Sequence, residues 1–161
     1  MKSLGVLIIF LQVLYAQGYT FDEERYSNAL ERSIKLQGEI YFEDENLYIE
    51  YVKESKTIKY TDGSVHYFED KDEVRIDDEV RAKLAHYFEI LLLLHKNEET
   101  EIKRHFNITK KNDSLRLTPK GTLQRYIKAL SIRKENNELS EVKLFLQNDD
   151  SIRIIIGNAI R

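Results

Sequence analysis

Short runs that alternate apolar and polar residues constrain this chain more than any other feature. Such alternation has the period of a β-strand with one buried face. The runs lie at 40–42, 47–51, 58–60, 65–67, 74–76, 102–109, 115–120, 126–133, 139–146 and 152–156. Turn residues separate them, and Asp62-Gly63 is the strongest hairpin signal, because a type I′ turn needs positive φ at both central residues. We therefore predict a meander of about five short antiparallel strands, followed by a second group of strands.

Two other segments have the 3.6-residue period of an amphipathic helix. The first is Phe21–Leu36, where Asp22 can cap the start and Gly38 follows the end. The second begins at Asp77, with carboxylates at the positive end of the helix dipole, and ends near Asn97. Its residues 90–94 are apolar all round. This predicts either cover on more than one side or a cavity beside the helix.

The first residues have the pattern of a secretory signal peptide. Lys2 gives a short basic start, residues 4–15 are apolar apart from Gln12, and Ala16 is a small residue at the expected cleavage site. The apolar run is too short to cross a bilayer of about 30 Å as a helix. We expect residues 1–16 to be the leader of an exported protein; the alternative is a buried N-terminal helix or strand.

Composition excludes several classes of function. The chain has 161 residues, which fits one domain over residues 17–161. Its net charge of −3 with mixed signs gives no basic face for nucleic acid. It has no Cys, so it can form no disulfide, thiolate zinc site or acylated N-terminal Cys. An exported form is therefore expected to be free of a lipid anchor.

These elements predict a mainly β (α+β) fold. A sheet of this many strands curls, and we expect an incomplete antiparallel barrel with helices as a lid on its concave face. Two helices are few for a curled sheet of this size. The arrangement therefore predicts an apolar hollow between lid and sheet, of a kind that suits an acyl chain.

Catalytic patterns are absent from the sequence. It contains no G-x-S-x-G, no glycine-rich phosphate loop and no H-E-x-x-H. His86 and Glu89 are three residues apart on the second helix, but two ligands without a third are weak evidence for a metal. We expect no enzyme activity, no catalytic residues, no cofactor and no metal.

Several segments, taken in order, resemble the outer-membrane lipoprotein carrier family, LolA. They cover most of the chain after the leader, and the gaps between them fit the family. They are Gly38-Glu39-Ile40-Tyr41-Phe42, Asn46-Leu47-Tyr48, Tyr60-Thr61-Asp62-Gly63, Val65-His66-Tyr67-Phe68, Phe106-Asn107-Ile108, Leu115-Arg116-Leu117-Thr118-Pro119-Lys120 and the hairpin 139–156 with its turn at 147–150. Three departures stand out: Asp44 occupies the position of the family's lid-latch Arg, the chain has no Trp, and the final loop and strand of longer members do not follow the strand at 152–156.

The resemblance implies a soluble, monomeric chaperone of the periplasm that takes part in outer-membrane biogenesis. Such a carrier receives the acyl chains of lipoproteins from an inner-membrane exporter and passes them to an outer-membrane acceptor lipoprotein. Two alternatives remain open. The chain could carry another lipid or a glycolipid, or it could be a lipoprotein-sensing or partner-binding module of the same superfamily.

The candidate lipid-binding groove combines the sheet wall with the lid. Burial of each CH₂ contributes about 0.8 kcal/mol, so acyl chains need an extended apolar surface. The candidates are Ile40, Phe42, Leu47, Ile49, Tyr51, Tyr60 and Tyr67 on the wall and Leu84, Phe88, Leu91 and Leu92 on the lid. The alternative is that both sets pack as a solid core without a groove.

Overall fold

The computed structural model describes residues 17–160, and one antiparallel sheet of 11 strands accounts for most of them. The strands are β1 (Gln17–Ser27), β2 (Arg32–Glu43), β3 (Asn46–Tyr51), β4 (Lys56–Thr61), β5 (Ser64–Glu69), β6 (Asp72–Glu73), β7 (Phe106–Lys111), β8 (Ser114–Pro119), β9 (Ile127–Glu135), β10 (Glu138–Leu146) and β11 (Ser151–Ile160). The helices are α1 (Asp78–Lys96), α2 (Glu99–His105) and the 3₁₀ helix η1 (Gly121–Arg125). The predicted leader at residues 1–16 lies outside the described residues.

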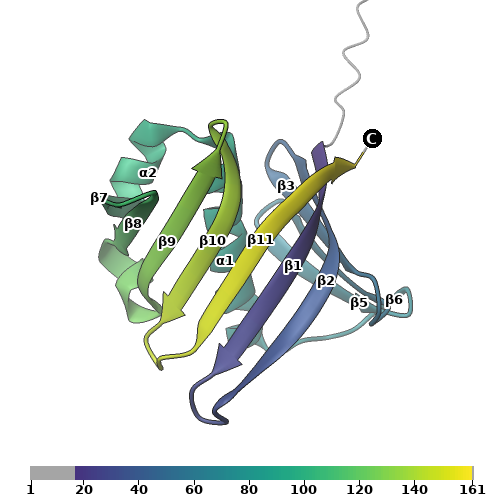
Figure 1. The fold of residues 1–161 in the computed structure, drawn as a ribbon. Coiled ribbons are helices and arrows are strands. Elements are labelled where there is room, and N and C mark those ends of the chain that lie inside the picture. The colour runs from purple at the N-terminus through teal and green to yellow at the C-terminus, as the bar shows by residue number, and fades with distance from the viewer. Residues whose placement is uncertain (1–16, 161) are drawn as a thin grey trace, which may run out of the picture.

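The sheet is curled and open. Its order is β6-β5-β4-β3-β2-β1-β11-β10-β9-β8-β7, so β1 and β11 pair at the centre while β6 and β7 form the two free ends. In Figure 1 the central strands cross the front and α1 lies behind them, in the hollow of the sheet. The predicted fold class, a curled antiparallel sheet with helical cover on its concave face, is confirmed.

The predicted helix at Phe21–Leu36 is wrong. This segment contains most of β1, a turn at residues 28–31 and the first part of β2, and the two strands pair continuously from Gln17↔Phe42 to Ser27↔Arg32. The reason is visible on the inner face of β1, where Glu23 and Arg25 follow Phe21 at strand spacing. Two charged residues in core-facing positions broke the apolar alternation, and the remaining apolar residues imitated a helical period.

The predicted meander is confirmed for β2 to β5. Each strand pairs antiparallel with the next, with Leu47↔Tyr60 and Ile49↔Ile58 in register. Asp62 (φ 52°) and Gly63 (φ 74°) both lie in the left-handed region that a type I′ turn requires.

The last expected strand of that meander, residues 74–76, is wrong. Only Asp72 and Glu73 form β6, and the chain then leaves the sheet, because Asp77 caps α1 by accepting a hydrogen bond from the Glu79 N–H (2.9 Å).

The long helix α1 forms where it was predicted. It ends at Asn97, which has the left-handed φ of 57° that is common at helix C-termini. The expected strand at Ile102–Thr109 is half wrong: residues up to His105 belong to α2, and β7 begins at Phe106. Acidic residues in the first turn and basic residues in the last turn favour this short helix, whose Ile102 is buried in the core.

The second group of strands is confirmed as a meander, β7 to β11. Its inner face and that of β1 to β5 form one apolar cluster with α1 and α2. Within residues 17–160, no helix is both long and apolar enough to cross a membrane.

Candidate functional site

The predicted groove residues all come together between α1 and the concave face of the sheet. Nine of them are buried and belong to the core cluster, while Tyr67 and Leu84 are partly buried and pack against it. The buried nine are Ile40, Phe42, Leu47, Ile49, Tyr51, Tyr60, Phe88, Leu91 and Leu92. In this closed arrangement they form packed core. Their binding of lipid remains a prediction.

The lid helix α1 is attached to the rim of the sheet by two polar contacts, one partly buried and one at the surface. Tyr60 donates a hydrogen bond to Glu89 of α1 (3.1 Å), and Lys96 at the end of α1 pairs with Glu45 in the β2–β3 turn. The pKa of Tyr60 is raised to about 12 by burial and by the nearby Glu89 carboxylate. An exposed ion pair such as Lys96–Glu45 contributes about 0–1 kcal/mol. This pair therefore adds little resistance to lid movement.

An aromatic contact also holds the C-terminal end of α1 against the sheet. The His95 ring stacks on Phe42 with centroids 3.9 Å apart and an angle of 10° between the planes. Burial lowers the pKa of His95, although the charge of Glu138 opposes this. The neutral ring is thus favoured, as a stack inside an apolar layer requires.

One polar network interrupts the apolar layer. Glu23 of β1 is only 2% exposed and is the one buried charged residue of the described chain. Arg25 donates to its carboxylate from Nε (2.9 Å) and Nη2 (3.3 Å), and also from Nη2 to the Tyr51 hydroxyl (2.8 Å). Tyr51 in turn donates to Glu23 (2.7 Å). The charge of Glu23 is therefore compensated by two side chains, Arg25 and Tyr51, which are also bonded to each other.

The pKa shifts in this network agree with its geometry. Burial acts to lower the pKa of Arg25, but the charge and hydrogen bonds of Glu23 outweigh it, so the pKa lies above its ordinary value. Burial, followed by the Glu23 charge, raises the pKa of Tyr51. Both groups keep their ordinary neutral-pH forms: a charged guanidinium and a protonated phenol.

Beside this network, α1 carries an unsatisfied polar group. The Tyr87 hydroxyl is buried and has no hydrogen-bond partner among residues 17–160. Burial also raises its pKa well above the ordinary value. A buried hydroxyl without a partner costs about 1–3 kcal/mol, so the closed position of α1 carries a penalty at this point.

The concave face continues beyond the network without cover. Leu30, Ile34, Leu146 and Ile152 line a hollow of about 180 Å³, with Arg25 at its inner boundary. Ile34 is 49% exposed and Leu30 is 64% exposed. The sheet thus presents an open apolar end next to the closed layer.

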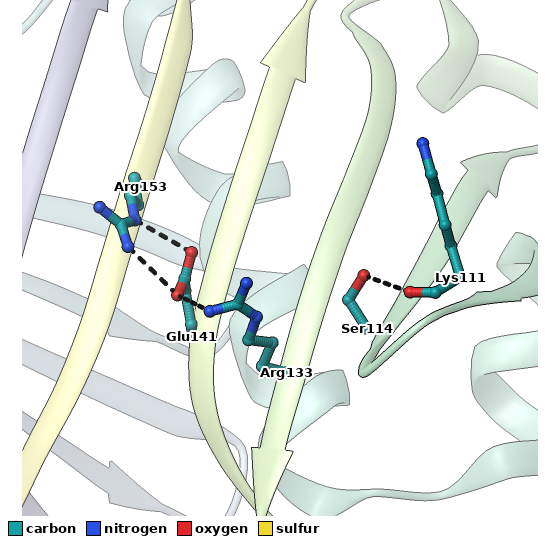
Figure 2. A network of polar contacts seen from close by, with 5 residues as sticks. All are labelled: Lys111, Ser114, Arg133, Glu141 and Arg153. Atoms are coloured by element: carbon teal, nitrogen blue, oxygen red, sulfur yellow. Dashed lines mark hydrogen bonds and ion pairs between the residues drawn. The ribbon is translucent and has the colours of Figure 1, made fainter.

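The convex face has a different character. Figure 2 shows Glu141 of β10 between two arginines on neighbouring strands. Arg153 donates to it from Nε (2.9 Å) and Nη2 (3.3 Å), and Arg133 approaches at 3.5 Å. The hydrogen bonds from Arg153 lower the pKa of Glu141. In the β7–β8 turn of the same view, Ser114 donates to the carbonyl of Lys111 (3.0 Å).

Possible metal ligands among residues 17–160 are scattered. No group of three or more His, Cys, Asp and Glu among them could hold a metal ion. His86 and Glu89 share a face of α1 as expected, 3.4 Å apart, but both side chains are largely exposed.

Sequence reasoning missed two parts of this site. The Glu23–Arg25–Tyr51 network was hidden because Glu and Arg are ordinary on an exposed helix face, and nothing local connects them to Tyr51. The open end was hidden because Leu30 and Ile34 were placed on the predicted helix. Tyr19 and Phe21, which are aromatic and two residues apart, are the local strand signal that was available.

Comparison with solved structures finds a distant likeness of fold. No family model matches the chain, and no curated protein matches it. Among solved structures, it is similar to a LolA superfamily protein from Nitrosomonas europaea, with 7% sequence identity and a TM-score of 0.42. The match covers 91% of this chain and 86% of the other.

Proposed function

We propose that this protein is a carrier that binds the acyl chains of lipoproteins between α1 and the concave face of the sheet. The observation that carries the proposal is the two-part concave face, in which a closed apolar layer adjoins an open apolar end across the Glu23–Arg25–Tyr51 network. An acyl chain that enters at the open end can extend beneath α1 if the helix is displaced.

Two properties of the lid favour such displacement. Its Lys96–Glu45 rim contact is at the surface and weak. Its closed position leaves the Tyr87 hydroxyl without a hydrogen-bond partner among residues 17–160. Opening costs apolar contacts, and burial of acyl CH₂ groups, at about 0.8 kcal/mol each, offsets that cost. In a carrier of this kind, either α1 or the acyl chain covers the apolar face of the sheet. Release of the acyl chain is then as accessible as its binding.

We place this activity in the periplasm, after removal of residues 1–16. Lipoproteins would be received from an inner-membrane exporter and delivered to an outer-membrane acceptor lipoprotein, with the carrier acting as a monomer. No enzymatic step is part of the proposal, because hiding an acyl chain from water requires burial alone.

The decisive experiment fixes the lid. Because the chain has no Cys, Glu45→Cys with Lys96→Cys introduces the only two thiols, and a short bis-maleimide can join them across the rim contact. The matched control joins Glu99→Cys to Lys103→Cys, an ion-paired couple within α2. Both proteins receive a synthetic diacylated lipopeptide, and native mass spectrometry measures the bound fraction.

We expect the lipopeptide to bind one to one to the wild type and to the α2 control, and to be lost from the lid-locked protein. Equal binding by the locked protein would overturn the site beneath α1. Absence of binding to the wild type would overturn the carrier function. Protein purified from periplasm that contains a tagged lipoprotein tests the cargo: a bound glycolipid in its place would favour the alternative carrier.

A further inference from the structure

The first part of β2, residues 32–36, has a free edge. On one side β1 pairs with all of β2, whereas on the other side β3 pairs only from Gly38 onward. The last contact across that side is the Val52 N–H, which donates to the Gln37 carbonyl (3.1 Å). Residues 32–36 therefore have a paired neighbour on one side alone.

The hydrogen-bond pattern identifies which backbone groups face this edge. Bonded residues alternate along an antiparallel strand, and Gln37 is bonded toward β3. Ser33 and Lys35 therefore direct their N–H and C=O groups to the free side, while Ile34 and Leu36 are bonded toward β1. Turn and loop hydrogen bonds within residues 17–160 engage neither Ser33 nor Lys35, and both residues are exposed.

A hollow of about 520 Å³ runs along this edge and the sheet surface beside it. Lys35, Leu36 and Gln37 form one wall, and Tyr51, Lys53 and Glu54 form another. An unpaired edge with an adjacent hollow is the geometry that accepts an added strand. Five residues of free edge match a peptide segment of about 17 Å at 3.4 Å per residue.

The charges along the edge favour an acidic partner. Glu54 is paired with Lys56 (3.3 Å), and Asp22 accepts a hydrogen bond from Gln37 (2.7 Å). Glu24 lies across from both Lys35 and Arg153 on the convex face. By contrast, Arg32, Lys35 and Lys53 make no ion pair within the described chain. A second copy of β2 would bring like charges together, which is unfavourable across strands.

We infer that the free edge of β2 binds an extended acidic polypeptide segment as an added strand. The edge lies beside the open apolar end of the concave face, where the acyl chain of the same molecule enters. This inference rests on the proposed function, because it assigns a second contact to the same cargo. In the bound peptide, we expect the side chains opposite Ile34 and Leu36 to face the concave side and to be apolar. We expect the peptide side chain opposite Lys35 to be acidic. A lipoprotein supplies both parts in one covalent molecule.

Residue-resolved amide hydrogen exchange tests the inference. The probe is a synthetic diacylated cysteine followed by alternating Asp and Val, compared with a fatty acid of equal chain length. The lipopeptide should slow exchange at Ser33 and Lys35 by about tenfold or more, as expected for newly formed backbone hydrogen bonds. Ile34 and Leu36 are internal controls because β1 already protects them. The fatty acid should bind without protecting Ser33 or Lys35.

Changes on both partners test the same bonds. N-methylation of alternate peptide bonds in the probe should reduce its affinity about tenfold, in line with the loss of one or two hydrogen bonds. Lys35→Pro removes an N–H that faces the edge, a position where proline is tolerated, and Lys35→Ala is the control that keeps it. Lys35→Pro should weaken lipopeptide binding by a similar factor and leave fatty acid binding unchanged.

Separate outcomes overturn the two proposals. If lipopeptide binds while Ser33 and Lys35 exchange as before, the edge inference fails and the carrier function stands. If neither acyl probe binds, the carrier function fails, and the unacylated peptide at millimolar concentration then tests the edge alone. Protection that rises with protein concentration without peptide, together with dimers in sedimentation, would assign the edge to a second copy and overturn the inference.

Discussion

The two ends of the concave face carry the same kinds of residues but differ in what covers them. Where α1 packs on the sheet, Leu47 of β3 and Leu91 of α1 are fully buried. Past the Glu23–Arg25–Tyr51 network, Ile34 and Leu30 are about half exposed or more. The alternation of apolar and polar residues along the strands produces the covered and the uncovered part of the concave face in the same way. The lid therefore determines which part of the apolar face is core and which part stays accessible.

The polar network lies at the boundary between these ends. A buried carboxylate is compatible with the core only while its partners hold it, and Arg25 also lines the open hollow. This position limits how far the packed layer extends along β1. The contrast between the covered end and the open end can be tested by substitutions of matched size.

Truncation of an apolar residue should have its largest effect in the layer where the lid packs against the sheet. Leu91→Ala removes a fully buried side chain and should lower the free energy of unfolding by about 2–5 kcal/mol. Ile34→Ala at the open end should cost less than about 1 kcal/mol. Urea unfolding of both variants measures the difference. Equal losses would contradict the view that only one end is packed core.

Removal of the buried charge should have the next largest effect. Glu23→Gln keeps the shape but leaves Arg25 without its carboxylate. Because the Arg25 side chain is 43% exposed, we expect a loss of about 2–3 kcal/mol, below the 3–5 typical of fully buried pairs. The neighbouring Glu24→Gln, on the convex face, should change unfolding by less than about 0.5 kcal/mol. A stable Glu23→Gln variant would show that the network does not stabilise the boundary.

A smaller loss of stability is expected at Gly38, where the pairing of β2 with β3 begins. At Gly38 an added Cβ would lie 2.2 Å from the Glu50 carbonyl oxygen and 2.9 Å from the Phe21 ring. Gly38→Ala should therefore cost about 1–3 kcal/mol through local overpacking. Ser33→Ala, on the exposed part of the same strand, is the control and should be near neutral. Thermal unfolding compares the two, and an unchanged midpoint for Gly38→Ala would contradict the close approach.

The sequence predicts the hairpins well because their signals are local. The alternation around Ile49 and Ile58, together with the turn at Asp62-Gly63, fixes pairing and register within a few residues. It also predicts α1, where Asp77 and Asn97 mark the ends. These features need no information from distant parts of the chain.

The sequence fails where an interaction over long range decides the structure. Glu23 faces the core only because Tyr51, 28 residues later, completes its hydrogen bonds. Read locally, Glu23 and Arg25 favour an exposed helix. The predicted groove residues lie together in or against one core cluster, but alternation is the same for a packed layer and an open one. Whether Leu91 or Ile34 meets solvent depends on where α1 lies, and this is a tertiary property.

The smallest expected effect concerns pH and the end of the lid. Burial lowers the pKa of His95 below its unfolded value near 6.5, so the unfolded chain binds the proton more readily than the folded one. Stability from this residue is present at neutral pH and is lost as pH falls below about 6.5. Glu141 has a lowered pKa as well, but its contribution is lost only in the carboxylate range. The window from pH 7 to pH 5.5 therefore isolates His95.

In that window, urea unfolding of the wild type should show stability that decreases with acidification, and His95→Gln should show a flatter profile. The variant loses the stack on Phe42, so its stability at pH 7 should be somewhat lower, while the two profiles converge toward pH 5.5. A wild-type stability that rises on acidification would mean that the attraction of Glu138 outweighs burial. The end of α1 would then be as open to water as the uncovered end of the sheet.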